Sequence, residues 1–279
     1  MLAGHTEIWR AGRRCSELAA DDRGLHYGDG LFETLLVVNG ACHWLDLHLQ
    51  RLVAGASRLA IPLDERWLRA RIGDCLRTVS PAPHVLKLVL TRGSAPRGYR
   101  PPRQPSPTLM ISLSPVSLPS AAELKTGIRT RLCRQRLAIN TSLAGLKHLN
   151  RLEQVQACAE WSDPAVREGL MLDSQGALVE ATAANLFLVR DGTLHTPLLD
   201  RCGVAGVMRR LLMERFAPAL GLVCRVQRLS LDDLFAADEL LLCNSVMGIL
   251  PVRSVDCLQL EVGPVGQALV AQLAGYRHA

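Results

Sequence analysis

The sequence predicts a two-domain protein of mixed α/β (α+β) class. At 279 residues, the chain is long enough for two domains of ordinary size. In both halves, apolar runs typical of strands are interspersed with apolar residues at helical spacing. A segment rich in Ser and Pro, SPVSLPSAA (114–122), separates the halves. We therefore predict a smaller N-terminal α/β domain over 1–114, a linker over 115–122 and a larger C-terminal α/β domain over 123–279.

The first domain is expected to contain a β-hairpin followed by a helix. The run LFETLLVV (31–38) is typical of a strand, and the turn pair Asn39-Gly40 predicts a hairpin with a second strand over 41–45. Asp46 is expected to cap the helix that follows, because apolar residues then repeat at helical spacing. The other elements expected in this domain are a helix over 65–79 and strands over 84–91 and 108–113.

The second domain is expected to contain a meander of three or four strands. The passage LMLDSQGALVEATAANLFLVRDGTLHT (170–196) alternates apolar runs with turns at 174–176 and at Asp191-Gly192. The other elements expected there are a helix over 150–161, a helix that opens near Gly206, and strands over 222–227 and 239–245.

Composition narrows the functional class. The nine cysteines are scattered and never form Cys-x-x-Cys, which argues against a disulfide framework and against a zinc site. No signal-like segment opens the chain and no apolar stretch reaches about 18 residues, so we expect a cytoplasmic protein without a membrane partner. The net charge is +6, but the arginines are dispersed and aromatics are scarce. We therefore expect a small anionic substrate and no nucleic acid.

Lys147 is the first candidate for chemistry. It is one of only three lysines in a chain that otherwise uses arginine for positive charge. A solvated surface lysine is the ordinary interpretation, but the neighbours Leu146 and Leu149 favour partial burial. A partly buried lysine can lose its proton and act as a nucleophile, which arginine cannot do.

Glu180 follows the apolar strand residues ALV and is the candidate acidic group. It is either a surface carboxylate or the partner of a cofactor's pyridine nitrogen, whose protonated form a nearby anion stabilises. Asn185 is either a residue that orients such a carboxylate or a turn residue.

Three segments offer groups for binding a phosphate. Arg51 is either a helix-surface arginine or a bidentate clamp on the phosphate. The stretch GVAGVMRR (203–210) places small residues before a helix, so that backbone N–H groups at Val207 and Met208 are candidates for phosphate contacts. Ser245, at the end of the strand ELLLCN, either donates another hydrogen bond or caps the next segment.

Two further features concern catalysis and the substrate. The hydroxyl of Thr34 is expected on the face of its strand opposite Glu33, where it is a candidate for proton transfer or is present for its β-propensity alone. The loop TRGSAPRGYR (91–100) carries Arg92, Arg97 and Tyr99 after a strand end. It is either a flexible surface loop or a site that holds a substrate carboxylate.

Seven motifs together resemble the fold-type IV enzymes that use pyridoxal phosphate, a family that contains branched-chain and D-amino-acid aminotransferases and 4-amino-4-deoxychorismate lyases. They run in family order over about residues 20–252. The motifs are DRGLHYGDGLFETL (22–35), HLQRL (48–52), TRGSAPRGY (91–99), LAGLKHLNRLEQV (143–155), VEATAANLFLV (179–189), GVAGVMR (203–209) and ADELLLCNSVMGILPV (237–252).

The resemblance implies two α/β domains with pyridoxal 5'-phosphate in the cleft between them, and a homodimer. It implies that Lys147 is the Schiff-base lysine and general acid/base, and that Glu180 is the partner of the pyridine nitrogen. The phosphate would be held by Arg51, the backbone of Val207 and Met208, and Ser245. Arg97 and Tyr99 match positions that hold the substrate carboxylate across a dimer interface in D-amino-acid aminotransferases, and Thr34 matches a threonine of the lyases.

The segment KHLNRLEQV (147–155) is most similar to the lyases. The resemblance therefore implies conversion of 4-amino-4-deoxychorismate to 4-aminobenzoate and pyruvate, a step of folate biosynthesis. A D-amino-acid or branched-chain aminotransferase on the same fold is the alternative within the family. A cofactor-free protein that binds anions or nucleic acid is the alternative of another class.

Overall fold

The chain forms two compact units. The computed structural model describes residues 5–77 and 79–278. Unit 1 comprises Met1–Leu118 together with Lys147–Asn150, and unit 2 comprises Pro119–Leu146 and Arg151–Ala279. The division after Leu118 falls inside the segment that we predicted to be a linker. Lys147, expected in the second domain, groups with unit 1 instead.

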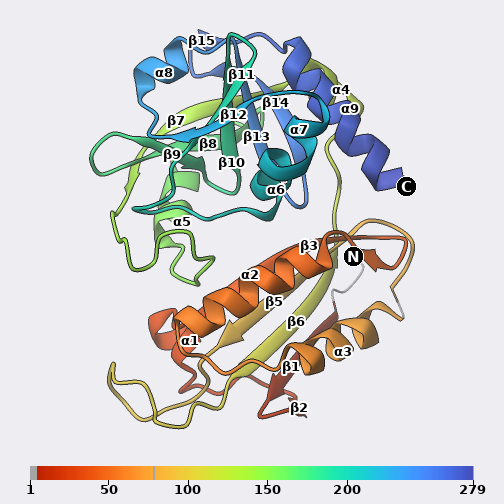
Figure 1. Ribbon diagram of the computed structural model, residues 1–279. Helices are drawn as coiled ribbons and strands as arrows, with labels where there is room; N and C mark the ends of the chain where they lie inside the picture. Colours follow the sequence, from red (N-terminus) through yellow and green to blue (C-terminus); the bar gives the residue numbers. More distant parts are fainter. Residues whose placement is uncertain (1–4, 78, 279) are drawn as a thin grey trace. The chain divides into compact units, whose positions relative to one another are not determined.

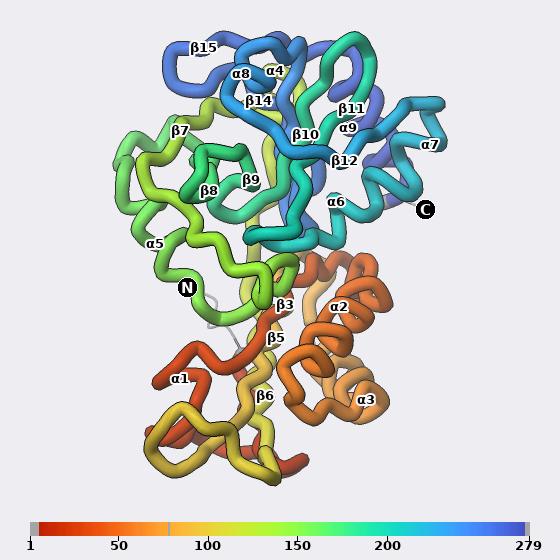
Figure 2. The backbone as a smooth tube through the Cα atoms, turned by 60° about the vertical axis from the view of Figure 1, so that its left-hand side comes forward, coloured from red at the N-terminus to blue at the C-terminus, as the bar shows by residue number. Residues whose placement is uncertain are grey.

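Unit 1 is built on a six-stranded antiparallel sheet in the order β2-β1-β6-β5-β3-β4. Helix α2 lies across β3, β5 and β6, and α3 lies on the same side of the sheet (Figures 1 and 2). The strands are β1 (His5–Arg10), β2 (Arg13–Cys15), β3 (Gly30–Val38), β4 (Ala41–Cys42), β5 (His84–Thr91) and β6 (Thr108–Pro115). The helices are α1 (Arg23–Tyr27), α2 (Leu45–Arg58) and α3 (Glu65–Leu76).

The alternation of side chains along β3 and β5 gives the sheet two different faces. Leu35, Leu86 and Leu88 are fully buried, as is Leu49 of α2. Between the buried leucines of β5, Lys87 is exposed. Successive strand residues point to opposite faces, so Lys87 lies on the face of the sheet opposite these buried leucines.

The predicted hairpin is confirmed, but the start of α2 is not where we expected it. Asn39 and Gly40 both have positive φ, as a two-residue turn between antiparallel strands requires. The second strand covers only Ala41–Cys42, and α2 begins at Leu45 after Trp44, which has a left-handed backbone and no side-chain cap. The expected cap, Asp46, therefore lies inside the first helical turn.

Unit 2 is built on a nine-stranded mixed sheet in the order β12-β11-β10-β13-β14-β7-β8-β9, with β15 paired to β14. Helix α5 packs on β7 and β8, and α9 packs on β13 and β14. The strands are β7 (Ile128–Leu137), β8 (Val166–Asp173), β9 (Leu178–Ala181), β10 (Asn185–Arg190), β11 (Thr193–Pro197), β12 (Cys224–Gln227), β13 (Glu239–Asn244), β14 (Gly248–Val255) and β15 (Leu258–Gln259). The helices are α4 (Ala121–Thr126), α5 (Leu152–Cys158), α6 (Val207–Leu211), the π-helix η1 (Leu212–Phe216), α7 (Ala217–Ala219), α8 (Leu231–Phe235) and α9 (Pro264–His278).

The predicted meander over 170–196 is wrong in its pairing. All four strands exist, and Asp191-Gly192 forms the expected turn with positive φ at both residues. However, β9 lies at the edge of the sheet beside β8, whereas β10 pairs with β13. The passage is thus two hairpins, with β7, β14 and β13 between them in the sheet.

Within the described residues, no helix is both long and apolar enough to cross a membrane. No group of three or more His, Cys, Asp or Glu side chains in that part of the chain is placed to hold a metal ion. All nine cysteines are free thiols.

Candidate active site

Lys147 is attached to unit 1 by main-chain hydrogen bonds to β3. The Phe32 N–H donates to the Lys147 carbonyl oxygen at 3.0 Å, and the Leu149 N–H donates to the Gly30 carbonyl oxygen at 3.0 Å. The segment 147–150 therefore runs alongside the start of β3 as a short antiparallel addition. This pairing explains why the segment 147–150 belongs to unit 1 although the chain before and after it belongs to unit 2.

The Lys147 side chain is half-buried, and its Nζ lies 4.2 Å from the centroid of the Phe32 ring. An ammonium group at this distance is attracted by the negative face of the ring. Phe32 and Thr34 alternate with the buried Glu33, so Phe32 and Thr34 share one face of β3. The structure thus places the ring that supports Lys147 and the Thr34 hydroxyl on the same side of the strand.

A residue that the sequence analysis missed, Lys87, also lies on this face. It is directly opposite Thr34 in the β3–β5 ladder, and its Nζ is 5.7 Å from the Phe32 ring centroid. Two of the three lysines of the chain therefore lie near one aromatic ring. The sequence signal was available, because a lysine inside the apolar run HVLKLVLT (84–91) must point away from the core.

Arg51 lies on the opposite side of β3, where it pairs with Glu33. Its Nε and Nη2 donate to the two Glu33 carboxylate oxygens at 2.7 and 2.6 Å, and His48 Nδ1 is 2.7 Å from Oε2. Burial alone would raise the pKa of Glu33, but the Arg51 charge and the hydrogen bonds from Arg51 and His48 lower it to about 2. Glu33 is therefore ionised at neutral pH, and its two oxygens fix the plane of the Arg51 guanidinium.

His48 is fully buried on α2 and is neutral. Burial lowers its pKa, as do the nearby charges of Arg51 and Lys147, and these effects outweigh the contact with Glu33. A carboxylate only accepts hydrogen bonds, so Nδ1 carries the imidazole proton and donates it to Glu33. Nε2 is then an acceptor, and it has no hydrogen-bond partner among the described residues.

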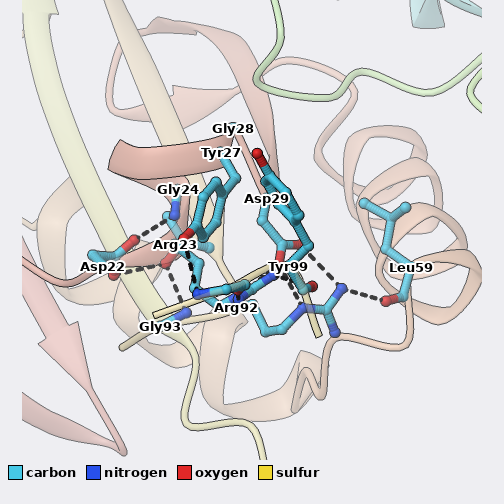
Figure 3. A network of polar contacts seen from close by, with 12 residues as sticks. Asp22, Arg23, Gly24, Tyr27, Gly28, Asp29, Leu59, Arg92, Gly93 and Tyr99 are labelled. Carbon is cyan, nitrogen blue, oxygen red and sulfur yellow. Dashed lines mark hydrogen bonds and ion pairs between the residues drawn. The ribbon is translucent and has the colours of Figure 1, made fainter. Parts of the chain in front are cut away.

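Arg92 proves to be a structural residue in the network of Figure 3. Its guanidinium donates to both Asp29 carboxylate oxygens and to the carbonyl oxygens of Leu59 and Ala60, at 2.8 to 3.0 Å. Only 6% of the residue is exposed. Since all three of its nitrogens are engaged in the protein interior, these bonds give Arg92 a different role from the predicted substrate contact. In contrast, Arg97 and Tyr99 are exposed on the following loop.

In unit 2, the side chains of Glu180 and Asn185 both form hydrogen bonds with the backbone of Val204. Glu180, at 5% exposure on β9, accepts a hydrogen bond from the Val204 N–H at 2.8 Å through Oε2. Asn185 Nδ2 donates to the Val204 carbonyl oxygen at 2.8 Å. Asn185 begins β10 and contacts Val204 instead of the Glu180 carboxylate, so any effect that it has on the orientation of Glu180 passes through Val204. It holds the same loop segment that Glu180 holds.

Arg151 is a charged residue that interacts with Glu180 and that the sequence analysis did not name as a candidate. Burial lowers its pKa, while the negative charges of Glu180 and Glu153 act in the opposite direction. Arg151 thus supplies a partly buried positive charge that interacts electrostatically with Glu180.

The backbone at Gly206 leads directly into α6. Gly206 is the N-cap, and the side chains of Val207 and Met208 are buried, so only the backbone groups of these two residues are candidates for contact with a ligand. Ser245 follows β13, which is paired with β10. An added Cβ on Gly206 would overlap Asn185 Oδ1. A larger residue at this position would therefore have to displace the Asn185 side-chain amide.

Replacing Gly206 with alanine is expected to destabilise unit 2 by about 1–3 kcal/mol, because Asn185 must move and its bond to Val204 breaks. Urea unfolding of the variant measures this cost. Gly275→Ala, in α9, is the matched control because its added Cβ meets open space. Equal stability of both variants and the wild type would contradict the steric argument.

Comparison with known proteins identifies relatives over nearly the whole chain. Residues 30–255 match the family of class IV aminotransferases. The chain is 33% identical to the aminodeoxychorismate lyase of Vibrio harveyi, over 96% of this chain and 98% of that protein. The crystal structure of 4-amino-4-deoxychorismate lyase from Pseudomonas aeruginosa has 48% identity and a TM-score of 0.91, covering 96% of this chain and 98% of that one. The branched-chain amino acid aminotransferase of Escherichia coli has 26% identity and a TM-score of 0.83, covering 97% and 92%.

The family match covers well over half of the chain and includes β3, the Lys147 segment and the Glu180–Val204 region. The order of these features is the one that the sequence motifs predicted. The chain therefore belongs to the class IV aminotransferase family.

Proposed function

We propose that this chain is an aminodeoxychorismate lyase that uses pyridoxal 5'-phosphate to convert 4-amino-4-deoxychorismate to 4-aminobenzoate and pyruvate. The likeness to two lyases over almost the full length of each chain supports this reaction. The observation that carries the chemistry is the placement of Lys147, whose amine lies over Phe32 on the Thr34 face of β3. A primary amine is the group that covalent capture of an aldehyde cofactor requires, and the contact with Phe32 holds this amine at a defined position.

The residues present fit this cofactor. In unit 2, Glu180 is a buried carboxylate anchored by Val204, and Gly206 brings its backbone close to Asn185 where a side chain would not fit. We propose that Lys147 holds the aldehyde carbon and that Glu180 faces the pyridine nitrogen. The proposed phosphate ligands are Arg51, the N–H groups of Val207 and Met208, and Ser245.

The bound cofactor would supply an electron sink. We propose that the Lys147 amine removes the proton from the substrate carbon that carries nitrogen, while Glu180 favours the protonated form of the pyridine nitrogen. The Thr34 hydroxyl would deliver a proton to the departing enolpyruvyl group, which leaves as pyruvate. The fixed orientation of Arg51 by Glu33 would keep the phosphate, and thus the ring, in a single position.

The substrate carries two carboxylates, and we propose that exposed basic and polar groups bind them. The first two proposed carboxylate ligands are Arg97 and Tyr99, on the loop after β5, which the sequence analysis also named. Lys87 is added because it lies opposite Thr34 beside the Phe32 ring. Arg92 is left out because its donors are taken by Asp29 and by the carbonyl oxygens of Leu59 and Ala60.

Lys87→Gln is expected to raise the KM for aminodeoxychorismate about tenfold, because one charge-assisted hydrogen bond to a carboxylate is lost. Steady-state kinetics with detection of pyruvate measure the effect. Lys125→Gln is the matched control, since Lys125 is exposed at the end of α4 in unit 2. An unchanged KM in the Lys87 variant would remove this residue from the substrate site.

An aminotransferase is the second candidate, because a putative branched-chain-amino-acid aminotransferase of Methanocaldococcus jannaschii is 30% identical over 90% of the chain. The purified protein is incubated with pyridoxal phosphate and aminodeoxychorismate, and pyruvate and 4-aminobenzoate are quantified. A parallel reaction measures amino transfer to 2-oxoglutarate. Equal yields of pyruvate and 4-aminobenzoate support the lyase, whereas amino transfer without pyruvate release contradicts it.

We further propose a homodimer in the cytoplasm. The dimer rests on the family resemblance, and the compartment rests on the free, scattered thiols, which suit a reducing environment. Sedimentation of the purified protein tests the first proposal.

A further inference from the structure

Arg23 holds the backbone of the loop that carries Arg97 and Tyr99. Only 4% of this arginine is exposed, at the start of α1. Its Nη1 donates to the Gly98 carbonyl oxygen at 2.8 Å, and its Nη2 donates to the Tyr99 carbonyl oxygen at 2.9 Å. The third nitrogen, Nε, donates to Asp29 at 2.8 Å. One buried guanidinium thus fixes two consecutive peptide groups of an otherwise exposed loop.

Tyr27, one turn along α1, holds the same loop from a second direction. Its hydroxyl accepts a hydrogen bond from the Gly98 N–H at 3.3 Å. Its ring lies 4.9 Å from the Arg23 guanidinium carbon and 5.4 Å from the Tyr99 ring, edge to face. Tyr99 nevertheless remains 85% exposed. The contacts therefore fix the main chain and leave the side chains that face solvent available for a ligand.

Asp29 connects this arginine to the rest of unit 1. Its carboxylate accepts from both Arg23 and Arg92, and Arg92 continues to the carbonyl oxygens after α2 (Figure 3). Burial raises the pKa of Asp29, but the hydrogen bonds and charges of Arg92 and Arg23 lower it below its ordinary value overall. The carboxylate is therefore charged, and the loop is tied to the sheet and to the end of α2 through a continuous charged network.

We propose that Arg23 is a positioning residue for substrate recognition, which presents Arg97 and Tyr99 to a substrate carboxylate by fixing the Gly98–Tyr99 backbone. This inference rests on the proposed function, because the loop is assigned to the substrate there. The physical advantage is that the loop is ordered during folding, so that binding does not have to meet the entropic cost of ordering it.

The test uses Arg23→Gln and Arg23→Lys in the cofactor-loaded protein. Glutamine removes both the positive charge and the guanidinium group. Lysine keeps the charge, but its single ammonium nitrogen does not reproduce the planar arrangement of donors that reaches two carbonyl oxygens. The first readout is kcat and KM for aminodeoxychorismate. The second is the rate at which trypsin cleaves after Arg97, followed by mass spectrometry under native conditions. The matched control is Arg131→Gln in unit 2, because Arg131 also donates to a carbonyl and a carboxylate oxygen, both of Glu160.

We expect Arg23→Gln to raise KM about tenfold, with kcat within about threefold of the wild type, since the loss concerns binding of the ground state and transition state alike. Cleavage after Arg97 should accelerate by a similar factor, and Arg23→Lys should restore little of either property. Arg131→Gln should change neither.

Three results would overturn the inference. The first is an unchanged cleavage rate in Arg23→Gln. The second is faster cleavage with an unchanged KM, which would make Arg23 a loop anchor without a role in recognition. The third is an equal loss of kcat and of cofactor binding, which would indicate general unfolding. The trypsin experiment requires no turnover, so a failure of the proposed reaction in the wild type is distinguishable from a failure of this inference.

Discussion

Lys147→Ala is expected to lower the release of pyruvate from aminodeoxychorismate by about four orders of magnitude, because the variant lacks the amine that we propose as nucleophile and general base. The fold should survive, since the hydrogen bonds that attach this segment to β3 come from the main chain of Lys147 and Leu149. A coupled pyruvate assay measures the first effect. Circular dichroism and urea unfolding measure the second.

Two further variants separate the amine from the positive charge. Lys147→Arg keeps a cation near Phe32, but a guanidinium does not lose its proton at accessible pH, so this variant should be equally inactive. Lys125→Ala, on the exposed end of α4, should keep full activity. Borohydride reduction of the cofactor-loaded wild type, followed by peptide mass spectrometry, should find the modification at position 147. Modification at Lys87 or Lys125 instead would show that the nucleophile is misassigned.

Strands and turns that depend mainly on the local sequence were predicted well. The strand His84–Thr91 has the expected bounds, and both Asn39-Gly40 and Asp191-Gly192 form the expected turns. The errors arise where distant contacts decide the structure. Trp44 adopts a left-handed backbone that no propensity predicts, and β10 pairs with β13, which is about fifty residues away in the sequence.

The site shows the same division between local and distant causes. Strand alternation was sufficient to put the Thr34 hydroxyl on the side opposite Glu33. In contrast, the hydrogen bonds of Arg92 go to Asp29 and to the carbonyl oxygens of Leu59 and Ala60, which lie far away in the sequence. The local sequence around Arg92 therefore does not predict its structural role. The pairing of Glu33 with Arg51 was likewise not foreseen. The apolar spacing predicts which face of α2 is buried, but it does not show that Arg51 meets a carboxylate 18 residues earlier in the chain.

A large loss of stability is expected when Glu33 is replaced. Glu33→Gln should lower the free energy of unfolding at pH 7 by about 3 kcal/mol, which is the size that a pKa lowered from 4.5 to about 2 implies. The reason is that Arg51 and His48 lose the buried carboxylate that both of them contact. Urea unfolding measures the loss. Glu65→Gln is the control, because the Glu65–Arg69 pair is about 40% exposed on both sides and should contribute under about 1 kcal/mol.

The stabilisation by Glu33 should depend on pH in a defined direction. Because the folded protein holds Glu33 at a lower pKa than the unfolded chain does, the unfolded chain binds the proton more readily. The stabilisation is therefore complete above about pH 4.5 and is lost as the pH falls towards about 2. The difference in stability between the wild type and Glu33→Gln should shrink as the pH falls from 6 to ~3.5, because the Glu33 carboxylate takes up a proton in the unfolded wild-type chain while it stays ionised in the folded protein. A difference that stays constant over this range would mean that the carboxylate charge is not what stabilises the pair. In that case Arg51 would be oriented by packing alone, and our proposal that Glu33 helps to position a phosphate through Arg51 would lose its basis.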